Sequence, residues 1–211
     1  MEPLVQLLQT SDAQGKAEAA WALANLAVNN NDNKVAIAQA SAVEPLVQLL
    51  RTGNAKGKAM SAGALRILVS SNADDNQQVD MVVRAGAVDP LVQLLHTGDA
   101  KGKAEAAGAL RNLAYDNHAN KVAIARAGAM DPLVQLLRTG NPKGKAMAAG
   151  ALRILASHND ENKVAIVARA GAVEPLVELL HTGDAKGKGL AAGALRNLRV
   201  NADEQHTPLS E

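Results

Sequence analysis

Apolar and polar residues alternate along this chain with helical spacing, and the pattern itself recurs five times. In residues 99–113, DAKGKAEAAGALRNL, the residues Ala106, Leu110 and Leu113 fall at i, i+4 and i+7, the spacing of an apolar helix stripe. Each copy begins with Asn or Asp, whose side chain can cap a helix N-terminus. We therefore predict five long helices, over Asp12–Leu26, Asn54–Leu68, Asp99–Leu113, Asn141–Leu155 and Asp184–Leu198.

A second pattern places an acid-Pro pair and a short apolar run before each long helix, as in EPLVQLL and DPLVQLL. The prolines recur every 42 to 45 residues, at Pro3, Pro45, Pro90, Pro132 and Pro175. Four of them follow a further helical segment, at Asn33–Ala40, Asn76–Ala85, Asn120–Ala127 and Asn162–Ala170, and the last three segments close with Ala-Gly, a typical helix stop. The unit is thus three helices in about 42 residues, a period that indicates a repeat protein.

Alternate units are more alike than neighbours. The second and fourth carry RTGN and ALRIL, whereas the third and fifth carry HTGD and ALRNL. The third and fifth also contain one extra residue before the acid-Pro pair, between Val79 and Pro90 and between Val164 and Pro175. One residue turns a helix face by about 100°, so we expect a bulge or a longer turn in both places.

The stretch NKVAIARAGAMDPLVQLL, residues 120–137, and the long-helix ending ALRNL resemble the armadillo repeat, in particular the type found in plant, algal and yeast vacuolar armadillo proteins. HEAT repeats have two helices per unit and fit less well. The resemblance implies an all-α, right-handed α-solenoid over residues 1–200, followed by a polar tail at 201–211. It would comprise four complete three-helix units and one N-terminal unit that lacks its first helix.

Composition narrows the function. The chain is 47% hydrophobic but has no Phe, one Trp and one Tyr, so its core must be aliphatic. It has no Cys, which excludes disulfides and thiolate sites. The five His form no catalytic or metal motif, and no phosphate-binding glycine loop is present. We therefore expect no enzyme, no cofactor, no metal and no small-molecule substrate. Nothing resembles a signal peptide or a membrane span, so a cytoplasmic location, or a nuclear one, is expected.

The resemblance implies that the third, long helix of each unit lines a concave groove that binds an extended peptide or protein. Peptide-binding armadillo proteins present a Trp and, four residues later, an Asn, and only the first unit keeps both. In the other units Gly replaces the Trp, and an Arg stands three residues after each Gly. Without the Trp residues, binding of basic peptides as in nuclear import is disfavoured. The candidate groove residues are Trp21, Asn25, Arg66, Arg111, Asn112, Arg153, Arg196 and Asn197.

Two alternatives stay open for these columns of residues. The arginines can bind carboxylates or phosphates of an acidic, extended ligand. Alternatively, each can pair with an acid of a neighbouring unit, such as Glu105, or cover apolar surface with its stem. The glycines at 63, 108, 150 and 193 either allow a close approach of the backbone or were inherited by duplication.

Lysines gather at the starts of the long helices and predict a basic edge that could hold an anion or nucleic acid. At a net charge of +1 nucleic-acid binding is the weaker hypothesis, and most such charge rows are solvated faces. These lysines are Lys56, Lys58, Lys101, Lys103, Lys143, Lys145, Lys186 and Lys188.

The ends of the array predict self-association, because apolar residues there lack a neighbouring unit. A homodimer would form through Leu4, Leu7 and Leu8 or through Leu195 and Leu198. The sequence thus favours a non-enzymatic scaffold that binds an extended peptide. The alternative is an engineered, consensus-like array without a selected ligand, which the near-identity of the copies favours.

Overall fold

The computed structural model describes residues 1–70 and 77–198, which form helices joined by short turns. The five long helices are α2 (Ala13–Ala27), α5 (Ala55–Leu68), α8 (Ala100–Ala114), α11 (Pro142–Ala156) and α14 (Ala185–Leu198). The acid-Pro runs form α1 (Glu2–Thr10), α4 (Val43–Thr52), α7 (Val88–Thr97), α10 (Met130–Thr139) and α13 (Val173–Thr182). The remaining segments are α3 (Asn31–Gln39), α6 (Gln77–Arg84), α9 (His118–Arg126) and α12 (Asp160–Val164), which continues into the π-helix η1 (Ala165–Arg169).

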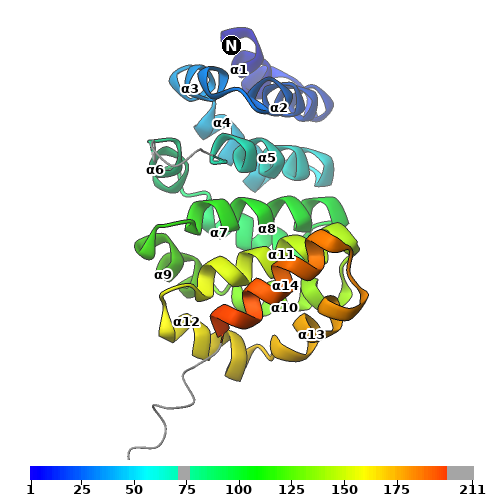
Figure 1. The fold of residues 1–211 in the computed structure, drawn as a ribbon. Coiled ribbons are helices and arrows are strands. Elements are labelled where there is room, and N and C mark those ends of the chain that lie inside the picture. Colours follow the sequence, from blue (N-terminus) through cyan, green and yellow to red (C-terminus); the bar gives the residue numbers. More distant parts are fainter. Residues whose placement is uncertain (71–76, 199–211) are drawn as a thin grey trace, which may run out of the picture.

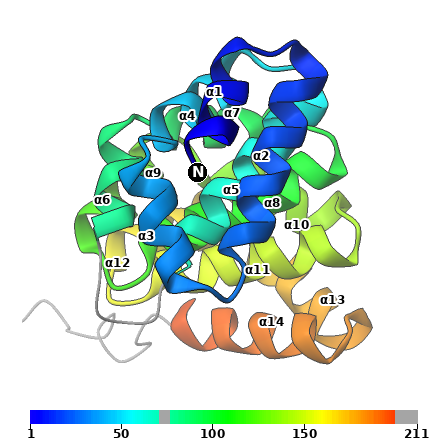
Figure 2. The ribbon, with the colours of Figure 1, turned by 90° about the horizontal axis from the view of Figure 1, so that it is seen from above.

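The units stack one on another, and the long helices form one continuous layer through the stack (Figure 1). Helix α2 contacts α5, α5 contacts α8, α8 contacts α11 and α11 contacts α14. Seen from above, the short first helices α3, α6, α9 and α12 lie on a different side of the stack from the long helices (Figure 2). Each long helix also packs against the acid-Pro helix of its own unit. The prediction of an all-α repeat solenoid is confirmed.

The N-caps predicted for the long helices are present. The side chains of Asp12, Asn54, Asp99, Asn141 and Asp184 each accept a hydrogen bond of 2.7 or 2.8 Å from the backbone N–H of a glycine three residues later. Such a bond pairs one of the backbone donors that a helix N-terminus leaves free. The same short sequence therefore fixes the start of every long helix.

Three of the short first helices, α3, α9 and α12, start two residues earlier than the sequence predicted, whereas the start predicted for the other one, Asn76, lies outside the described residues. Helix α3 begins at Asn31 rather than Asn33, and α9 begins at His118 rather than Asn120. The true caps are Asn30, Asn117 and Asn159, which accept hydrogen bonds of 2.9 Å from the N–H three residues on. The asparagines that the sequence placed at the helix starts form a different hydrogen bond. Their side-chain amides donate to the end of the preceding long helix, as Asn120 does to the Leu113 carbonyl at 2.8 Å.

The predicted Ala-Gly stops end these helices in the left-handed conformation. Gly86, Gly128 and Gly171 have φ values of +74°, +82° and +63°. Ser41 holds the same place in the second unit with φ +59°, a conformation that costs a residue with a Cβ roughly 1–2 kcal/mol. The stop is therefore a property of the repeat, and Ser41 adopts it under strain.

The extra residue of the fifth unit forms the bulge that was expected. From the buried Ile124 to the stop at Gly128 is four residues, whereas from the buried Ile166 to Gly171 is five. The additional residue is taken up within η1, in keeping with the origin of most π-helices as single-turn bulges inside α-helices.

The extra residue of the third unit is absorbed differently. Val82 is fully buried and lies four residues before Gly86, the spacing of the units that lack the insertion. The insertion therefore precedes Val82, and α6 contains no bulge. The same insertion has two structural outcomes.

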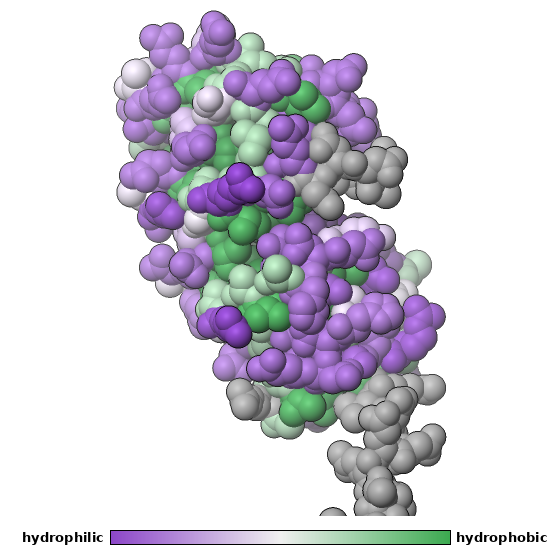
Figure 3. Space-filling model, turned by 90° about the vertical axis from the view of Figure 1, so that its left-hand side faces the viewer, coloured by the Kyte–Doolittle hydropathy of each residue, from purple (hydrophilic) through white to green (hydrophobic). Residues whose placement is uncertain are grey.

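The core is a continuous aliphatic layer between successive long helices. Leu110 and Leu152, which the sequence placed between units, are fully buried, as are Ala106 and Leu113. The stripe assignment is therefore confirmed. On the side of the short helices the surface is mainly hydrophilic, with apolar patches between units (Figure 3). In the described part of the chain, no helix is both long and apolar enough to cross a bilayer. The predicted polar tail at 201–211 lies outside the described residues.

Candidate functional site

The long-helix face, formed by α2, α5, α8, α11 and α14, brings the glycine and arginine columns together. The stem of each arginine crosses the glycine of the next long helix. A Cβ at Gly108 would lie 2.4 Å from Cδ of Arg66, and one at Gly193 would lie 2.6 Å from Cδ of Arg153. At Gly150 the distance to Cδ of Arg111 would be 3.1 Å. Three of the four glycines therefore allow the close approach of an arginine side chain.

Gly63 is the exception. The preceding unit has Ala24 in the arginine position, and a Cβ at Gly63 would meet only Glu105, at 3.6 Å or beyond. That is an ordinary contact, so packing does not require glycine at this position. Of the two explanations for the column, close approach holds at Gly108, Gly150 and Gly193, and inheritance by duplication fits Gly63.

Arg66 is paired within the chain, as one of the alternatives proposed. Its Nε donates to Oε2 of Glu105 at 2.6 Å, and Nζ of Lys143 donates to Oε1 at 2.7 Å. The network joins α5, α8 and α11, and Glu105 is only 5% exposed. Burial raises the pKa of Glu105, but hydrogen bonds and charges from Lys143 and Arg66 outweigh it and hold the pKa below its ordinary value. Glu105 is therefore a buried carboxylate that links three units.

Arg111 has no carboxylate partner among the described residues. Its Nε and Nη2 donate to Oδ1 of Asn112 at 3.2 and 3.0 Å, and Nδ2 of Asn112 donates to the Arg66 carbonyl at 3.0 Å. Burial lowers the pKa of Arg111, and the charges of Arg66 and Arg153 lower it further. Arg111 thus lies close enough to the guanidinium groups of Arg66 and Arg153 to be repelled by both, and only Arg66 of the three has a carboxylate partner among the described residues.

Arg153 is half-buried and makes no side-chain hydrogen bond within the described residues. Its Nε is buried without an acceptor. Asn197 donates to the Arg153 carbonyl at 2.9 Å, just as Asn112 donates to that of Arg66. Two of the three predicted groove asparagines, Asn112 and Asn197, therefore hold neighbouring long helices together. Arg196 is exposed on the last described long helix.

Trp21 and Asn25 lie apart from these contacts, on α2. Both residues are exposed, and Trp21 is 52% accessible. They occupy one helix face, at i and i+4. The structure thus leaves this predicted pair open to solvent, at the opposite end of the long-helix face from Arg153 and Arg196.

Within the described residues, the predicted lysine edge is partly neutralised. Nζ of Lys56 lies 2.7 Å from Oε1 of Glu18, Lys143 pairs with Glu105, and Lys145 approaches Glu178 at 3.6 Å. Lys101 contacts the Sδ atom of Met60 at 3.7 Å. The lysines with no ion pair or side-chain hydrogen bond in this part of the chain are Lys58, Lys103, Lys186 and Lys188.

The apolar residues predicted for self-association are only partly accessible. Leu8 and Leu198 are 3% and 5% exposed, because they pack into the core of their own chain. The expectation that they are available to a second copy is wrong. Leu7 is 44% exposed, and Leu4 and Leu195 are partly buried. Association through these three residues stays a prediction.

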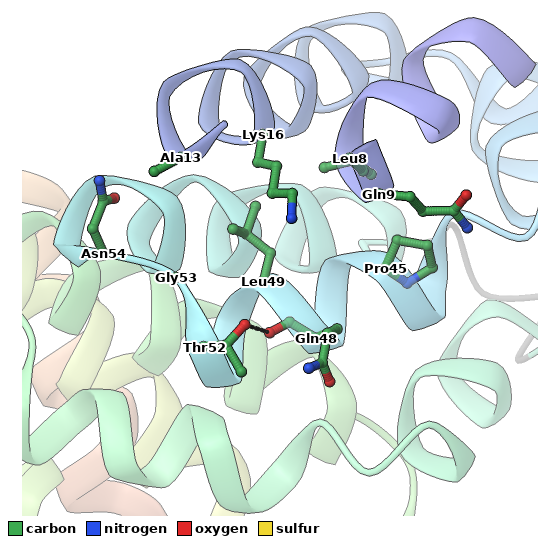
Figure 4. A pocket seen from close by; sticks show the side chains of 10 residues that line it. All are labelled: Leu8, Gln9, Ala13, Lys16, Pro45, Gln48, Leu49, Thr52, Gly53 and Asn54. Carbon is green, nitrogen blue, oxygen red and sulfur yellow. Dashed lines mark hydrogen bonds between the residues drawn. The ribbon is translucent and has the colours of Figure 1, made fainter. Parts of the chain in front are cut away.

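A hollow of about 380 Å³ lies between the first two units, where α1, α2 and α4 meet (Figure 4). Lys16 provides the one charged group in its lining, and the rest is apolar or neutral, such as Leu8, Leu49 and Gln48. No group of three or more His, Asp or Glu side chains suited to a metal occurs among the described residues. Lys16 is thus the single titratable side chain among the residues that line the hollow.

Two buried lysines were missed by the sequence reasoning. Lys34 donates to the Ser70 carbonyl, and Lys121 donates to the carbonyl and Oγ of Ser157 at 2.8 and 2.9 Å. Each neutralises the C-terminal end of the long helix of its own unit. Burial lowers the pKa of Lys34; burial also lowers that of Lys121, against the smaller opposing effect of Asp116. The Asn-Lys-Val motif of the first helices was the available signal.

Stacked three-helix units, with a row of charged and polar residues on the long-helix face, define an α-helical repeat solenoid. The family model described as Armadillo/beta-catenin-like repeat matches residues 1–28, 30–70, 75–115, 117–157 and 159–200. The chain belongs to the armadillo repeat family.

Several similar solved structures are engineered or designed proteins. One, an engineered protein, is 38% identical with a TM-score of 0.85, covering 93% of this chain and 78% of its own. A designed armadillo repeat protein in complex with the peptide (KR)4 is 32% identical with a TM-score of 0.81, covering 93% and 81%. A computationally designed armadillo repeat protein for modular peptide recognition is 29% identical with a TM-score of 0.82, covering the same shares. No curated protein matches the chain.

Proposed function

We propose that this protein is a non-enzymatic scaffold that binds an extended acidic peptide along the long-helix face. The observation that carries the proposal is the different pairing of successive arginines. Arg66 has a carboxylate partner in Glu105, whereas Arg111 and Arg153 have none among the described residues. A guanidinium group binds a carboxylate through two parallel hydrogen bonds. An acidic peptide would supply the carboxylates that the chain does not.

The charge of the face disfavours a basic peptide. Arg111, Arg153 and Arg196 follow one another on α8, α11 and α14, and like charges in a groove repel a ligand of the same sign. One similar designed protein binds (KR)4. The present chain has glycines rather than Trp in four of its five units, so aromatic walls for long basic side chains are also lacking. Trp21 and Asn25 would contact one end of a bound peptide.

A fluorescence titration with the labelled peptide (DE)4 tests the proposal, with (KR)4 as the basic counterpart. Arg111→Ala combined with Arg153→Ala should weaken the binding of (DE)4 by about tenfold or more, the change that 1.4 kcal/mol produces. The same double substitution should not weaken the binding of (KR)4. The matched control is Arg84→Ala combined with Arg126→Ala, which removes the same charge from exposed positions on α6 and α9. The proposal would be overturned if the double variant lost affinity equally for both peptides, or if the parent protein failed to bind (DE)4.

An engineered, consensus-like array without a selected ligand is the second candidate. The near-identity of the copies favours it, and several similar structures are engineered proteins. The same titration separates the two, because such an array should bind neither peptide through Arg111 and Arg153. Anion or nucleic-acid binding along the lysine edge is weaker, since Lys56, Lys143 and Lys145 already face carboxylates. Salt-sensitive retention on heparin that is lost in Lys58→Ala combined with Lys103→Ala would favour it.

A further inference from the structure

In α8, α11 and α14, one side chain lies over the glycine of the preceding long helix. It is the sixth residue after the N-cap. In α8 it is Glu105, whose Oε2 would lie 3.6 Å from a Cβ at Gly63. In α11 it is Met147, whose Sδ would lie 3.4 Å from a Cβ at Gly108. In α14 it is Leu190, whose Cδ2 would lie 3.6 Å from a Cβ at Gly150. The three side chains therefore occupy equivalent places in successive units.

Between α5 and α8, the arginine three residues after the glycine binds the side chain at this position. Arg66 follows Gly63 and pairs with Glu105. Arg153 follows Gly150, so the residue in the place of its carboxylate is Leu190, which cannot accept a hydrogen bond. Since the third and fifth units are otherwise the more similar pair, the change from Glu to Leu is a specific departure from the repeat.

Arg153 also lacks the second kind of partner. Asn112 follows Arg111 and accepts from its Nε and Nη2, but the residue after Arg153 is Ile154. The Nε of Arg153 is consequently buried without an acceptor, an unfavourable state for a charged donor group. The side chain as a whole is only half-buried, and within the described residues its terminal nitrogens make no hydrogen bond. A ligand can reach them at the surface, between α11 and α14.

We infer that Arg153 forms the specificity-determining subsite of the face, where its terminal guanidinium nitrogens bind a carboxylate of an Asp or Glu side chain of the peptide. Because Leu190 has no carboxylate, Arg153 forms no ion pair within the chain and is left to bind a carboxylate of the ligand. Arg111, on the preceding long helix, adds positive charge beside it and attracts the same group. The inference rests on the proposed function and deepens it, because it assigns acidic-peptide recognition to one position rather than to the column as a whole.

The test restores the internal carboxylate. Leu190→Glu should give Arg153 the ion pair that Arg66 has, and (DE)4 should then bind about tenfold more weakly than to the parent protein, the change that 1.4 kcal/mol produces. Leu190→Gln, which has the same shape without the charge, is the matched control and should bind (DE)4 like the parent. Arg153→Ala alone should weaken binding as much as Leu190→Glu does, and the two changes together should weaken it no further, because both remove the same site.

The outcomes distinguish the subsite from the broader proposal. If the parent fails to bind (DE)4, the proposed function itself is wrong. If the parent binds it and the Arg111 and Arg153 double variant does not, but Arg153→Ala alone and Leu190→Glu both bind like the parent, acidic recognition stands and the subsite is wrong. Equal weakening by Leu190→Gln and Leu190→Glu would also overturn the inference, since loss of Leu190 packing rather than charge would then be the cause. Circular dichroism establishes whether each variant is folded. If Leu190→Glu is unfolded, the binding of (DE)4 to Arg153→Ala alone tests the subsite.

Discussion

Alanine at two equivalent glycines should have opposite effects on stability, although the substitution is the same. At Gly63 the new Cβ meets only ordinary contacts at 3.6 Å or more. Alanine favours a helix over glycine by about 1 kcal/mol, so Gly63→Ala should stabilise the protein by up to that amount. At Gly108 the new Cβ would lie 2.4 Å from Cδ of Arg66 and 3.4 Å from Sδ of Met147. Arg66 must move.

The cost at Gly108 follows from the partner of Arg66. Its Nε is held 2.6 Å from a carboxylate that is itself buried, so displacing the stem weakens a charge-assisted hydrogen bond worth roughly 1.5–3 kcal/mol. After the helical gain of about 1 kcal/mol is subtracted, Gly108→Ala should destabilise the protein by about 0.5–2 kcal/mol. Gly193→Ala, at 2.6 Å from an arginine without an ion pair, should cost less.

Urea unfolding followed by circular dichroism measures these differences. The control is Gly108→Ala combined with Arg66→Ala, in which the obstruction is absent and the penalty of the glycine substitution should disappear. Equal effects of alanine at positions 63 and 108 would refute the reasoning, as would an unchanged penalty at 108 in the Arg66→Ala background.

Four further predictions concern single features of the fold. Ser41→Gly should stabilise the protein by about 1 kcal/mol in urea unfolding, because it removes a left-handed residue with a Cβ, whereas Ser70→Gly should not. The pKa of Glu105 lies below its ordinary value of 4.5, so its ion pairs stabilise the fold fully above that pH and are lost as pH falls through the lower folded pKa; Glu105→Gln should flatten the stability profile in that acidic window. Leu110→Ala should cost about 2–5 kcal/mol, since the side chain is fully buried, and a loss below about 0.5 kcal/mol would contradict the core assignment. Deleting Val167 should convert η1 into regular α-helix and raise the unfolding midpoint, and a lower midpoint would show that the bulge itself stabilises the fifth unit.

The sequence by itself determined the repeat architecture, because that architecture rests on local signals. The N-caps at Asp99 and its equivalents, the apolar stripe through Leu110 and the Ala-Gly stops each act within a few residues of the chain. Repetition then specifies the stacking, since each unit contacts mainly its neighbours. The earlier starts of α3 and α9 escaped prediction because two asparagines compete for the cap, and only one of them caps the helix.

Tertiary structure decided what the long-helix face offers a ligand. Arg66, Arg111 and Arg153 are equivalent in sequence, yet one pairs with a buried Glu, one with a neighbouring Asn and one with neither. Those partners depend on residues of other units and on the conformation of each side chain, and the periodicity of the repeat specifies neither. The same holds for the glycines, because the need for glycine at 108 but not at 63 depends on whether an arginine from the preceding unit crosses the helix. A contact between units depends on two sequence positions about 40 residues apart, and a single change such as Leu190 is enough to alter it.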